Sequence, residues 1–397
     1  MGYAHDITDW YLHPTRSESF VSIAIKLHQS ISDIAPSDWA ACAASDNPFI
    51  SHEFLKLLED SGSLGQRTGW FPQHMVMKQA NTIGAIIPMY VKHNSYGEFV
   101  FDHAWADALA RIGGQYYPKL QVAVPFCPVP GPRLLVHPQS SISIADIAKS
   151  LSTICREQAM SSVHITFCTT QEASELQNAG WIQRRDIQFH WHNHDYKQFD
   201  DFLGSLSSSH RKNIRRERRD VLAAGLTFHT LTGDDIKPHH WDAFYKFYLT
   251  TIERKWGSAY LTREFFGLLS ERLGNQVVLM LAQHDGRLVA GALNLKSSTR
   301  LYGRNWGCIG DWPFLHFELC YYRAIDYAIE HGLKVVEAGA QGTHKIQRGY
   351  LPTPTYSAHW IAHDGLSKAV RHFVAQESVA IDEHMATLSG LAPFKKI

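Results

Sequence analysis

The segment from Glu337 to Pro352, EAGAQGTHKIQRGYLP, concentrates the residue types best suited to chemistry. It begins at the end of an apolar, strand-like run, and its glycines give a turn whose backbone amides can face a ligand. Cations directly beyond a strand end suit a developing oxyanion or a phosphate group, although they also occur as surface charges on short helices. We predict catalytic roles for His344 and Lys345. For Gln341 and Arg348 we predict contacts with the substrate that donates the transferred group, here called the donor.

Two glutamates and one strand-like run could complete such a site. Glu337 ends an apolar strand, and Glu318 lies near the start of a long apolar helix, where it also complements the helix dipole. In a pocket, either carboxylate could orient an amine or act as a base, and we predict this role for both. In LYGRNWG, Gly303 marks a bulge or the close approach of a ligand, and Arg304 and Trp306 would lie at that opening.

The most basic segment is RKNIRRERR, residues 211–219, with six cations and one glutamate. Helical spacing places Arg211, Arg215 and Arg218 on one stripe. A solvated helix face and a phosphate-binding ridge both fit this pattern. We predict that Arg211, Lys212 and Arg215 bind the phosphate of a donor.

The composition excludes several classes of protein. The 38 Lys and Arg residues balance 38 Asp and Glu residues, so the whole chain is not an electrostatic binder of nucleic acid or membrane. Six cysteines without a CxxC pair predict free thiols in a reducing compartment, and no stretch resembles a signal peptide or membrane span. We expect a soluble, cytoplasmic protein. The HxHxH run at residues 190–194 lacks further ligands, and we predict no metal site.

Helical and strand-like runs alternate through both halves of the 397-residue chain. The second half predicts a helix at 199–224, an antiparallel meander over 277–307, a helix at 315–331 and a buried strand at 334–340. In the first half, a short strand is predicted at 98–101. We predict an α/β fold with mixed, mostly antiparallel sheets flanked by helices, in the element order of acetyltransferases. The predicted divisions are an arm at 1–40, two domains at 41–196 and 197–363, and a C-terminal helix at 364–397, with the chemistry in the second domain.

Several phrases resemble the FemAB-like family of predicted peptidoglycan-biosynthesis N-acyltransferases, from about Asn47 to Pro352. They include YGEFVFD, YYPKL, GPRLL, RKNIRRERR, AGALN, LYGRNWG, LHFELCYY and EAGAQGTHKIQRGYLP. The resemblance implies two tandem GNAT-type domains, similar to enzymes that move amino acids from aminoacyl-tRNA onto peptidoglycan precursors. It also implies that 211–219 binds a phosphate-bearing group, and that Lys345 and Arg348 lie where those enzymes keep a lysine near the transferred carbonyl. Thr343 and Cys127 depart from the family pattern, which usually has Glu and Thr there.

We therefore expect an N-acyltransferase that moves an acyl or aminoacyl group to an amine-bearing small molecule or peptide. No tightly bound cofactor is expected, and the co-substrate is acyl-CoA or aminoacyl-tRNA. One alternative is a non-catalytic protein that recognises a peptidoglycan precursor or RNA through residues 211–219. Another is a covalent cysteine enzyme that uses Cys308 or Cys320. The oligomeric state stays open.

Overall fold

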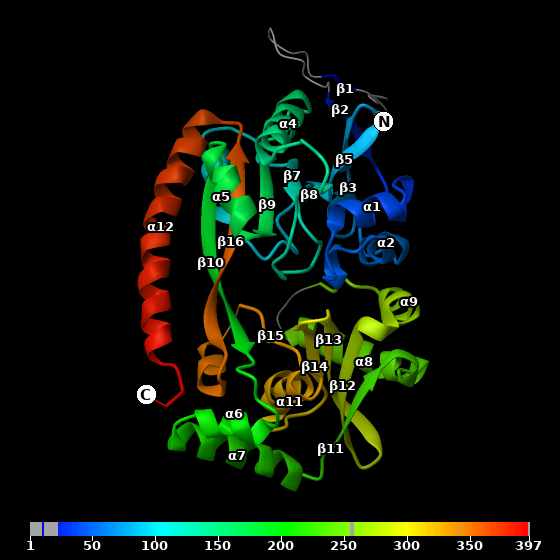
Figure 1. Ribbon diagram of the computed structural model, residues 1–397, viewed down its shortest axis with the longest axis vertical. Coiled ribbons are helices and arrows are strands. Elements are labelled where there is room, and N and C mark those ends of the chain that lie inside the picture. The colour runs from blue at the N-terminus through cyan, green and yellow to red at the C-terminus, as the bar shows by residue number, and fades with distance from the viewer. Residues whose placement is uncertain (1–9, 12–22, 255–257, 341, 396–397) are drawn as a thin grey trace. The chain divides into compact units, whose positions relative to one another are not determined.

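The computed structural model describes residues 10–11, 23–254, 258–340 and 342–395 (Figure 1). The chain divides into two compact units. Unit 1 contains the described residues of Met1–Ser45, with Phe49–Arg185 and Thr355–Glu377. Unit 2 contains the described residues of Asp46–Pro48, Asp186–Pro354 and Ser378–Ile397. These units are built from interleaved segments of the chain, and the predicted division into an arm, two domains and a C-terminal helix stays a prediction. The chain passes between units within β10 (Ile182–His192) and again within β16 (Leu351–Ile361).

Unit 1 contains two groups of strands. One is an antiparallel sheet in the order β1-β2-β4-β5-β8. In the other, β16, β9, β7, β6 and β3 are neighbours in that order, with β7 and β9 parallel. The strands are β1 Trp10–Tyr11, β2 Ile23–His28, β3 Trp70–Pro72, β4 His74–Gln79, β5 Thr82–Ile87, β6 Met89–Lys92, β7 Lys119–Val122, β8 Leu135–Val136 and β9 Ser162–Cys168. The helices are α1 Pro36–Ala43, α2 His52–Asp60, α3 His103–Arg111, α4 Ile144–Glu157 and α5 Thr170–Asn178.

In unit 2, β11, β12, β13, β14, β15 and β10 are neighbours in that order, and β14 and β15 run parallel. The strands are β11 Thr227–Thr232, β12 Val277–His284, β13 Arg287–Lys296, β14 Arg300–Cys308 and β15 Val335–Glu337. The helices are α6 Phe199–Ser205, α7 Ser208–Ala223, α8 Pro238–Arg254, α9 Arg263–Leu273, α10 Leu315–Phe317 and α11 Arg323–Glu330. A π-helical turn, η5 (Glu318–Tyr322), joins α10 to α11, and a 3-10 segment, η6 (Thr343–Arg348), follows β15.

Side-chain burial explains why these elements pack as they do. Ile214, Glu217 and Val221 form the buried face of α7 in unit 2. Alternate residues of β12 and β13 enter the same apolar cluster as α11, including Met280, Ala292 and Ile325. Among the described residues, no helix is both long and apolar enough to cross a membrane, and this includes the 27-residue α12 (Asp364–Gly390).

Three local predictions differ from the structure. The helix predicted at 199–224 is two helices, because the chain is extended at Leu206, which bridges Phe394 in the C-terminal segment. No strand forms at 98–101; Glu98 and its neighbours form a loop. The strand predicted at 334–340 ends at Glu337. In contrast, the bulge predicted at Gly303 is confirmed, since Leu293 faces Asn305 while Asn294 faces Gly303.

Candidate functional site

The candidate site lies in unit 2, where β14 and β15 part. The two strands pair in parallel only through Arg300–Tyr302 and Val335–Glu337. Beyond Glu337 the chain turns at Gly339, which has a φ of 74°, while β14 continues to Cys308. Strand ends that diverge in this way place side chains and free backbone groups at one edge of a sheet, a common position for ligand sites.

Glu337 is the buried carboxylate at this edge. Its side chain is 4% exposed and has Arg300 on one side, with 2.9 Å between Nη1 and Oε1. The second oxygen, Oε2, has no hydrogen-bond partner among the described residues and lies 3.9 Å from Nε2 of His190. Burial raises the pKa of Glu337 to about 7, against the opposing effect of Arg300. This carboxylate can therefore accept or release a proton near neutral pH.

His190 remains neutral beside it. It is the cross-strand neighbour of Glu337 on β10, and burial together with nearby cations lowers the pKa of His190 to about 3. Its Nε2 also lies 3.2 Å from Oε1 of Gln188. Neutral His190 adds no positive charge that would hold Glu337 ionised, so the proton affinity of this carboxylate stays high.

Lys345 is the buried cation of the same region. It is 4% exposed, and Nζ donates a hydrogen bond of 3.1 Å to the carbonyl oxygen of Gly339, directly after β15. The ammonium also lies 5.5 Å from the ring centroid of Phe189. Burial lowers the pKa of Lys345 to about 8. Among the described residues only Gly339 accepts a hydrogen bond from Nζ of Lys345, so the ammonium has further N–H groups for a carbonyl oxygen that gains negative charge.

His344 belongs to an aromatic group formed by η6 and the π-helical turn. Its Nε2 lies 3.0 Å from the hydroxyl of Tyr321, and its ring centroid lies 5.3 Å from that of Phe317. Burial, Arg348 and Lys345 lower the pKa of His344, which favours the neutral imidazole. A neutral imidazole beside Lys345 can carry a proton, which is the role predicted for it.

Arg304 and Trp306 lie on the bulged part of β14. Arg304 is the extra residue between Asn305 and Gly303 in the ladder with β13, and its charge acts on Glu337. The ring of Trp306 packs against His316, with centroids 5.2 Å apart. Both side chains are half-buried, so the bulge places one cation and one aromatic ring near the strand end.

Arg348 points into the interior and is bound by α7. It is 5% exposed, with Nη2 at 2.7 Å and 2.9 Å from the two carboxylate oxygens of Glu217. The hydroxyl of Tyr322 also donates to Glu217, and Nη1 of Arg348 donates to the carbonyl of His344. This guanidinium ties η6 to α7, and a contact between Arg348 and the donor stays a prediction.

Glu318 belongs to a different ionic group from Glu337. It is 2% exposed and lies 3.1 Å from both Nη2 of Arg218 and Nε of Arg323. Arg218 also donates to Asp326 at 2.6 Å. Burial raises the pKa of Glu318 although both arginines oppose this. Glu318 therefore forms ion pairs between α7 and the helix that begins at Leu315, and its role in orienting an amine stays a prediction.

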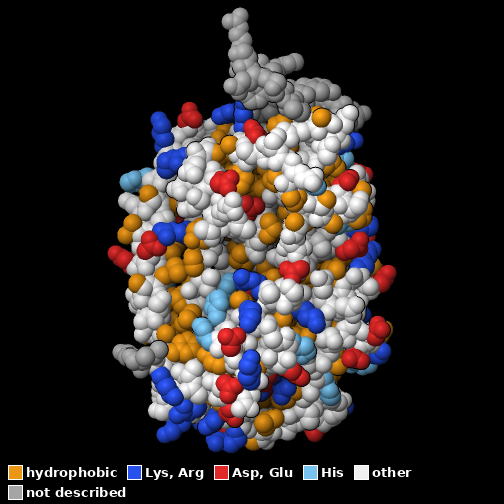
Figure 2. Space-filling model, in the orientation of Figure 1, with side chains coloured by type: hydrophobic (Ala, Val, Ile, Leu, Met, Phe, Trp, Pro, Cys, Tyr) orange, Lys and Arg blue, Asp and Glu red, His pale blue; other side chains and the backbone are white. Residues whose placement is uncertain are grey.

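The remaining cations of 211–219 lie on the outer face of α7. Lys212 is exposed, Arg211 is half-buried, and Arg215 pairs with Asp200 at 3.0 Å with both side chains largely exposed. Lys and Arg side chains gather over α6 and α7, at the lower left of Figure 2. The predicted Gln341 lies outside the described residues.

The residues gathered where β14 and β15 part are here called the strand-end group: His190, Arg300, Arg304, Trp306, Glu337, His344 and Lys345. Two of its members were not predicted from the sequence. Arg300 binds Glu337 from the first position of β14, and His190 was seen only as part of an incomplete metal motif. In the described part of the chain, no group of three or more His, Cys, Asp or Glu side chains could hold a metal. Burial raises the pKa of Cys320, which disfavours the thiolate that a covalent mechanism needs.

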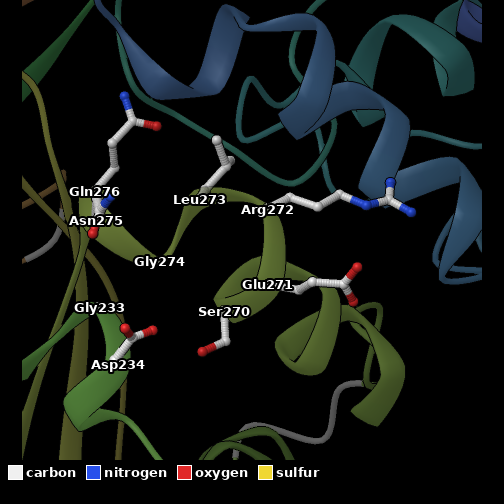
Figure 3. A pocket seen from close by; sticks show the side chains of 9 residues that line it. All are labelled: Gly233, Asp234, Ser270, Glu271, Arg272, Leu273, Gly274, Asn275 and Gln276. Carbon is white, nitrogen blue, oxygen red and sulfur yellow. The ribbon is translucent and has the colours of Figure 1, made fainter.

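A shallow hollow of about 250 Å³ lies elsewhere in unit 2, lined by Gly233, Asp234 and residues 270–276. Its charged side chains do not converge, because Glu271 and Arg272 point away from Asp234 (Figure 3). None of the residues of the strand-end group lines this hollow, and we assign no chemistry to it.

Comparisons with known proteins identify a matching family and several similar solved structures. The profile of the FemAB-like family, described as peptidoglycan biosynthesis/recognition, matches residues 30–396. The structure is similar to that of FemX, with a TM-score of 0.52, 11% identity, and coverage of 87% of this chain and 99% of that chain. It is also similar to the C-terminal domain of a putative lysylphosphatidylglycerol synthetase from Agrobacterium fabrum, with a TM-score of 0.54, 9% identity, and coverage of 87% and 96%. A tandem GNAT protein from the clavulanic acid pathway aligns with a TM-score of 0.46, 14% identity, and coverage of 86% and 99%. No curated protein matches the chain in sequence.

Proposed function

Since this chain belongs to the FemAB-like family, we propose that it is an N-acyltransferase that moves an acyl or aminoacyl group to a primary amine. One observation carries the proposal. Glu337 is buried, with one carboxylate oxygen that has no partner among the described residues and a pKa of about 7. A carboxylate with these properties is suited to take a proton from an attacking amine at neutral pH.

The proposed reaction uses Glu337 and Lys345 in complementary roles. The amine nitrogen attacks the donor carbonyl carbon and forms the new C–N bond, while Glu337 takes the proton that the nitrogen loses. The Lys345 ammonium donates to the carbonyl oxygen as it becomes negative. The ester or thioester bond then breaks, and the leaving oxygen or sulfur takes the proton back from Glu337. No covalent enzyme intermediate is required.

The donor is proposed to carry phosphate, which both aminoacyl-tRNA and acyl-CoA do. Lys212 and Arg215, on the outer face of α7, support this because their side chains are exposed to a ligand. Arg304 and Trp306 are proposed to contact the donor near the transferred carbonyl. A reducing, cytoplasmic environment stays a prediction from the sequence.

The test is a transfer assay with a primary-amine acceptor and either aminoacyl-tRNA or acyl-CoA as donor. We expect product with one of these donors, and a loss of roughly 100-fold or more in kcat for Glu337→Gln and Lys345→Met. Glu330→Gln and Lys334→Met are matched controls on exposed positions of the same unit. Wild-type turnover in both site variants, or no transfer from either donor, would refute the proposal.

A second candidate is recognition of a polyanion without catalysis. The observation that favours it is the exposed basic face of α7, which does not depend on the strand-end group. This function predicts salt-sensitive binding of RNA or an anionic cell-wall precursor. It also predicts that Glu337→Gln binds as the wild type does and that no product forms.

A further inference from the structure

Two buried lysines lie directly opposite each other on the sheet of unit 1. Lys92 on β6 faces Lys119 on β7 in the antiparallel register, and each is 0% exposed. Their strand neighbours Val91 and Leu120 point the other way, into the apolar core. Like charges that face each other across a sheet destabilise it, and buried charges are costly without partners. The pair therefore requires an anion.

In this structure the anions come from the segment that follows β6. Nζ of Lys119 lies 2.8 Å from Oε2 of Glu98 and 2.5 Å from Oδ2 of Asp102. Asp102 is held further by the hydroxyl of Tyr116 at 2.7 Å and adjoins α3. Asp102 therefore pairs with Lys119 from a fixed position, and Glu98 pairs with Lys119 through Oε2 while its other oxygen, Oε1, lies toward Lys92.

Glu98 serves Lys92 poorly. Its Oε1 lies 4.0 Å from Nζ of Lys92, beyond hydrogen-bond distance, and has no hydrogen-bond partner among the described residues. Lys92 instead donates to Oδ1 of Asn94 and to the carbonyl of Tyr96. Burial lowers the pKa of Lys92 to about 7 and raises that of Glu98 to about 7. Oε1 of Gln121, beside Lys119 on the same face, is also buried and has no partner within the described chain.

The segment that carries Glu98 is held to the sheet by the same two lysines, since Lys119 donates to Oγ of Ser95 at 2.9 Å and Lys92 donates to Asn94 and Tyr96. Residues 93–101, here called the strap, contain no helix or strand. Phe99 has a φ of 59°, a left-handed conformation that a bulky residue adopts at a cost of about 1–3 kcal/mol. Tyr96 and Phe101 are 72% and 64% exposed, so these two aromatic side chains add little to the packing of the strap.

We propose that Glu98 occupies an anion site between Lys92 and Lys119, and that the carboxylate or phosphate of a small ligand binds there by displacing it. The strap then acts as an internal competitor. The apparent affinity for the ligand then equals the intrinsic affinity multiplied by the fraction of molecules in which Glu98 has left the site. Gln121 and the two lysines form the ligand-facing surface, and none of them belongs to the strand-end group of unit 2.

The test measures binding of inorganic phosphate and of malonate to the full chain by calorimetry, at constant ionic strength. Glu98→Gln keeps the shape of the side chain and removes its charge. We expect it to bind one of these anions about tenfold more tightly than the wild type, a change that corresponds to about 1.4 kcal/mol of lost competition. The anion that binds identifies the source as phosphate or carboxylate. In the wild type, the same anion should speed amide hydrogen exchange within residues 94–101.

Two further variants make the test decisive. Glu175→Gln changes a half-buried carboxyl of the same unit, which accepts a hydrogen bond from Gln171 on α5, and should bind as the wild type does. Lys92→Met in the Glu98→Gln background should lose the gain in affinity, with folding checked by circular dichroism. Equal anion binding in Glu98→Gln and Glu175→Gln, or retention of the gain without Lys92, would overturn the proposal.

Discussion

Glu337 and Lys345 illustrate how burial prepares two opposite charges for one reaction. Each is 4% exposed, and in each case burial moves the pKa toward neutrality, to about 7 for Glu337 and about 8 for Lys345. A general base is most effective when its pKa lies near the working pH, and an ammonium with a pKa of about 8 is still mostly protonated at pH 7. The proposed chemistry therefore follows from desolvation at one strand end.

The pH dependence of transfer should be bell-shaped. Glu337 must be ionised to take a proton, so kcat/KM should rise as the pH passes about 7. Lys345 must be protonated to donate, so the rate should fall as the pH passes about 8. Steady-state kinetics from pH 5.5 to 9.5 measure this, with aminoacyl-tRNA kept intact by short reaction times. If Lys345→Arg leaves the fall in rate above pH 8 unchanged, Lys345 is not the group that causes this fall.

Loss of the buried charge should stabilise the fold. Burial raises the pKa of Glu337 in the folded protein from an ordinary value of 4.5 to about 7. The ionised carboxylate therefore lowers the free energy of unfolding, and this loss is fully present above pH 7 and disappears below pH 4.5. We expect Glu337→Gln to increase the free energy of unfolding by about 1–3 kcal/mol at pH 8. The gain should be much smaller at pH 5. Urea denaturation at both pH values tests this, and an equal effect at the two would argue against a buried, protonatable carboxylate.

At the scale of elements, η6 and α7 are joined by one buried ion pair. Arg348 and Glu217 are 5% and 7% exposed, and removal of one partner leaves an uncompensated buried charge. Glu217→Gln should destabilise the protein by about 3 kcal/mol and weaken the positioning of Lys345. Asp200→Asn, which breaks the exposed pair with Arg215, should cost less than about 1 kcal/mol. Thermal unfolding compares the two variants, and equal losses would contradict a specific role for the buried pair.

Local sequence patterns predicted individual helices, strands and turns better than the contacts between residues far apart in the chain. The meander from β12 to β14, the bulge at Gly303 and the turn after Glu337 follow from alternation and glycine placement. The break at Leu206 depends on Phe394, which lies far along the chain, and no local pattern reports it. The same limit applies to the site. The sequence indicates Arg348 as a cation within 337–352 and Glu318 as a carboxylate on a nearby helix. It does not indicate their partners Glu217 and Arg218, which lie 131 and 100 residues away along the chain.

At the scale of the whole molecule, a net charge of zero leaves recognition of a polyanion to local surfaces. Donor binding through the outer face of α7 should weaken as salt increases. Lys212→Gln and Arg215→Gln should each reduce the slope of log K against log salt by about 1. Fluorescence binding titrations at several salt concentrations measure the slope, with Lys334→Gln as the control. Unchanged slopes would show that the donor does not bind to the outer face of α7.

The most direct test of the account is the single-turnover rate of acyl transfer to a primary amine at pH 7.5, with enzyme in excess over donor. The comparison is between the wild type, Glu337→Gln and Glu330→Gln. If Glu337 takes the amine proton, its variant should be slower by roughly 10²–10⁴-fold, with donor affinity unchanged and the Glu330 variant equal to the wild type. A Glu337→Gln rate within a few-fold of the wild type would show that the buried carboxylate at the end of β15 is not the base.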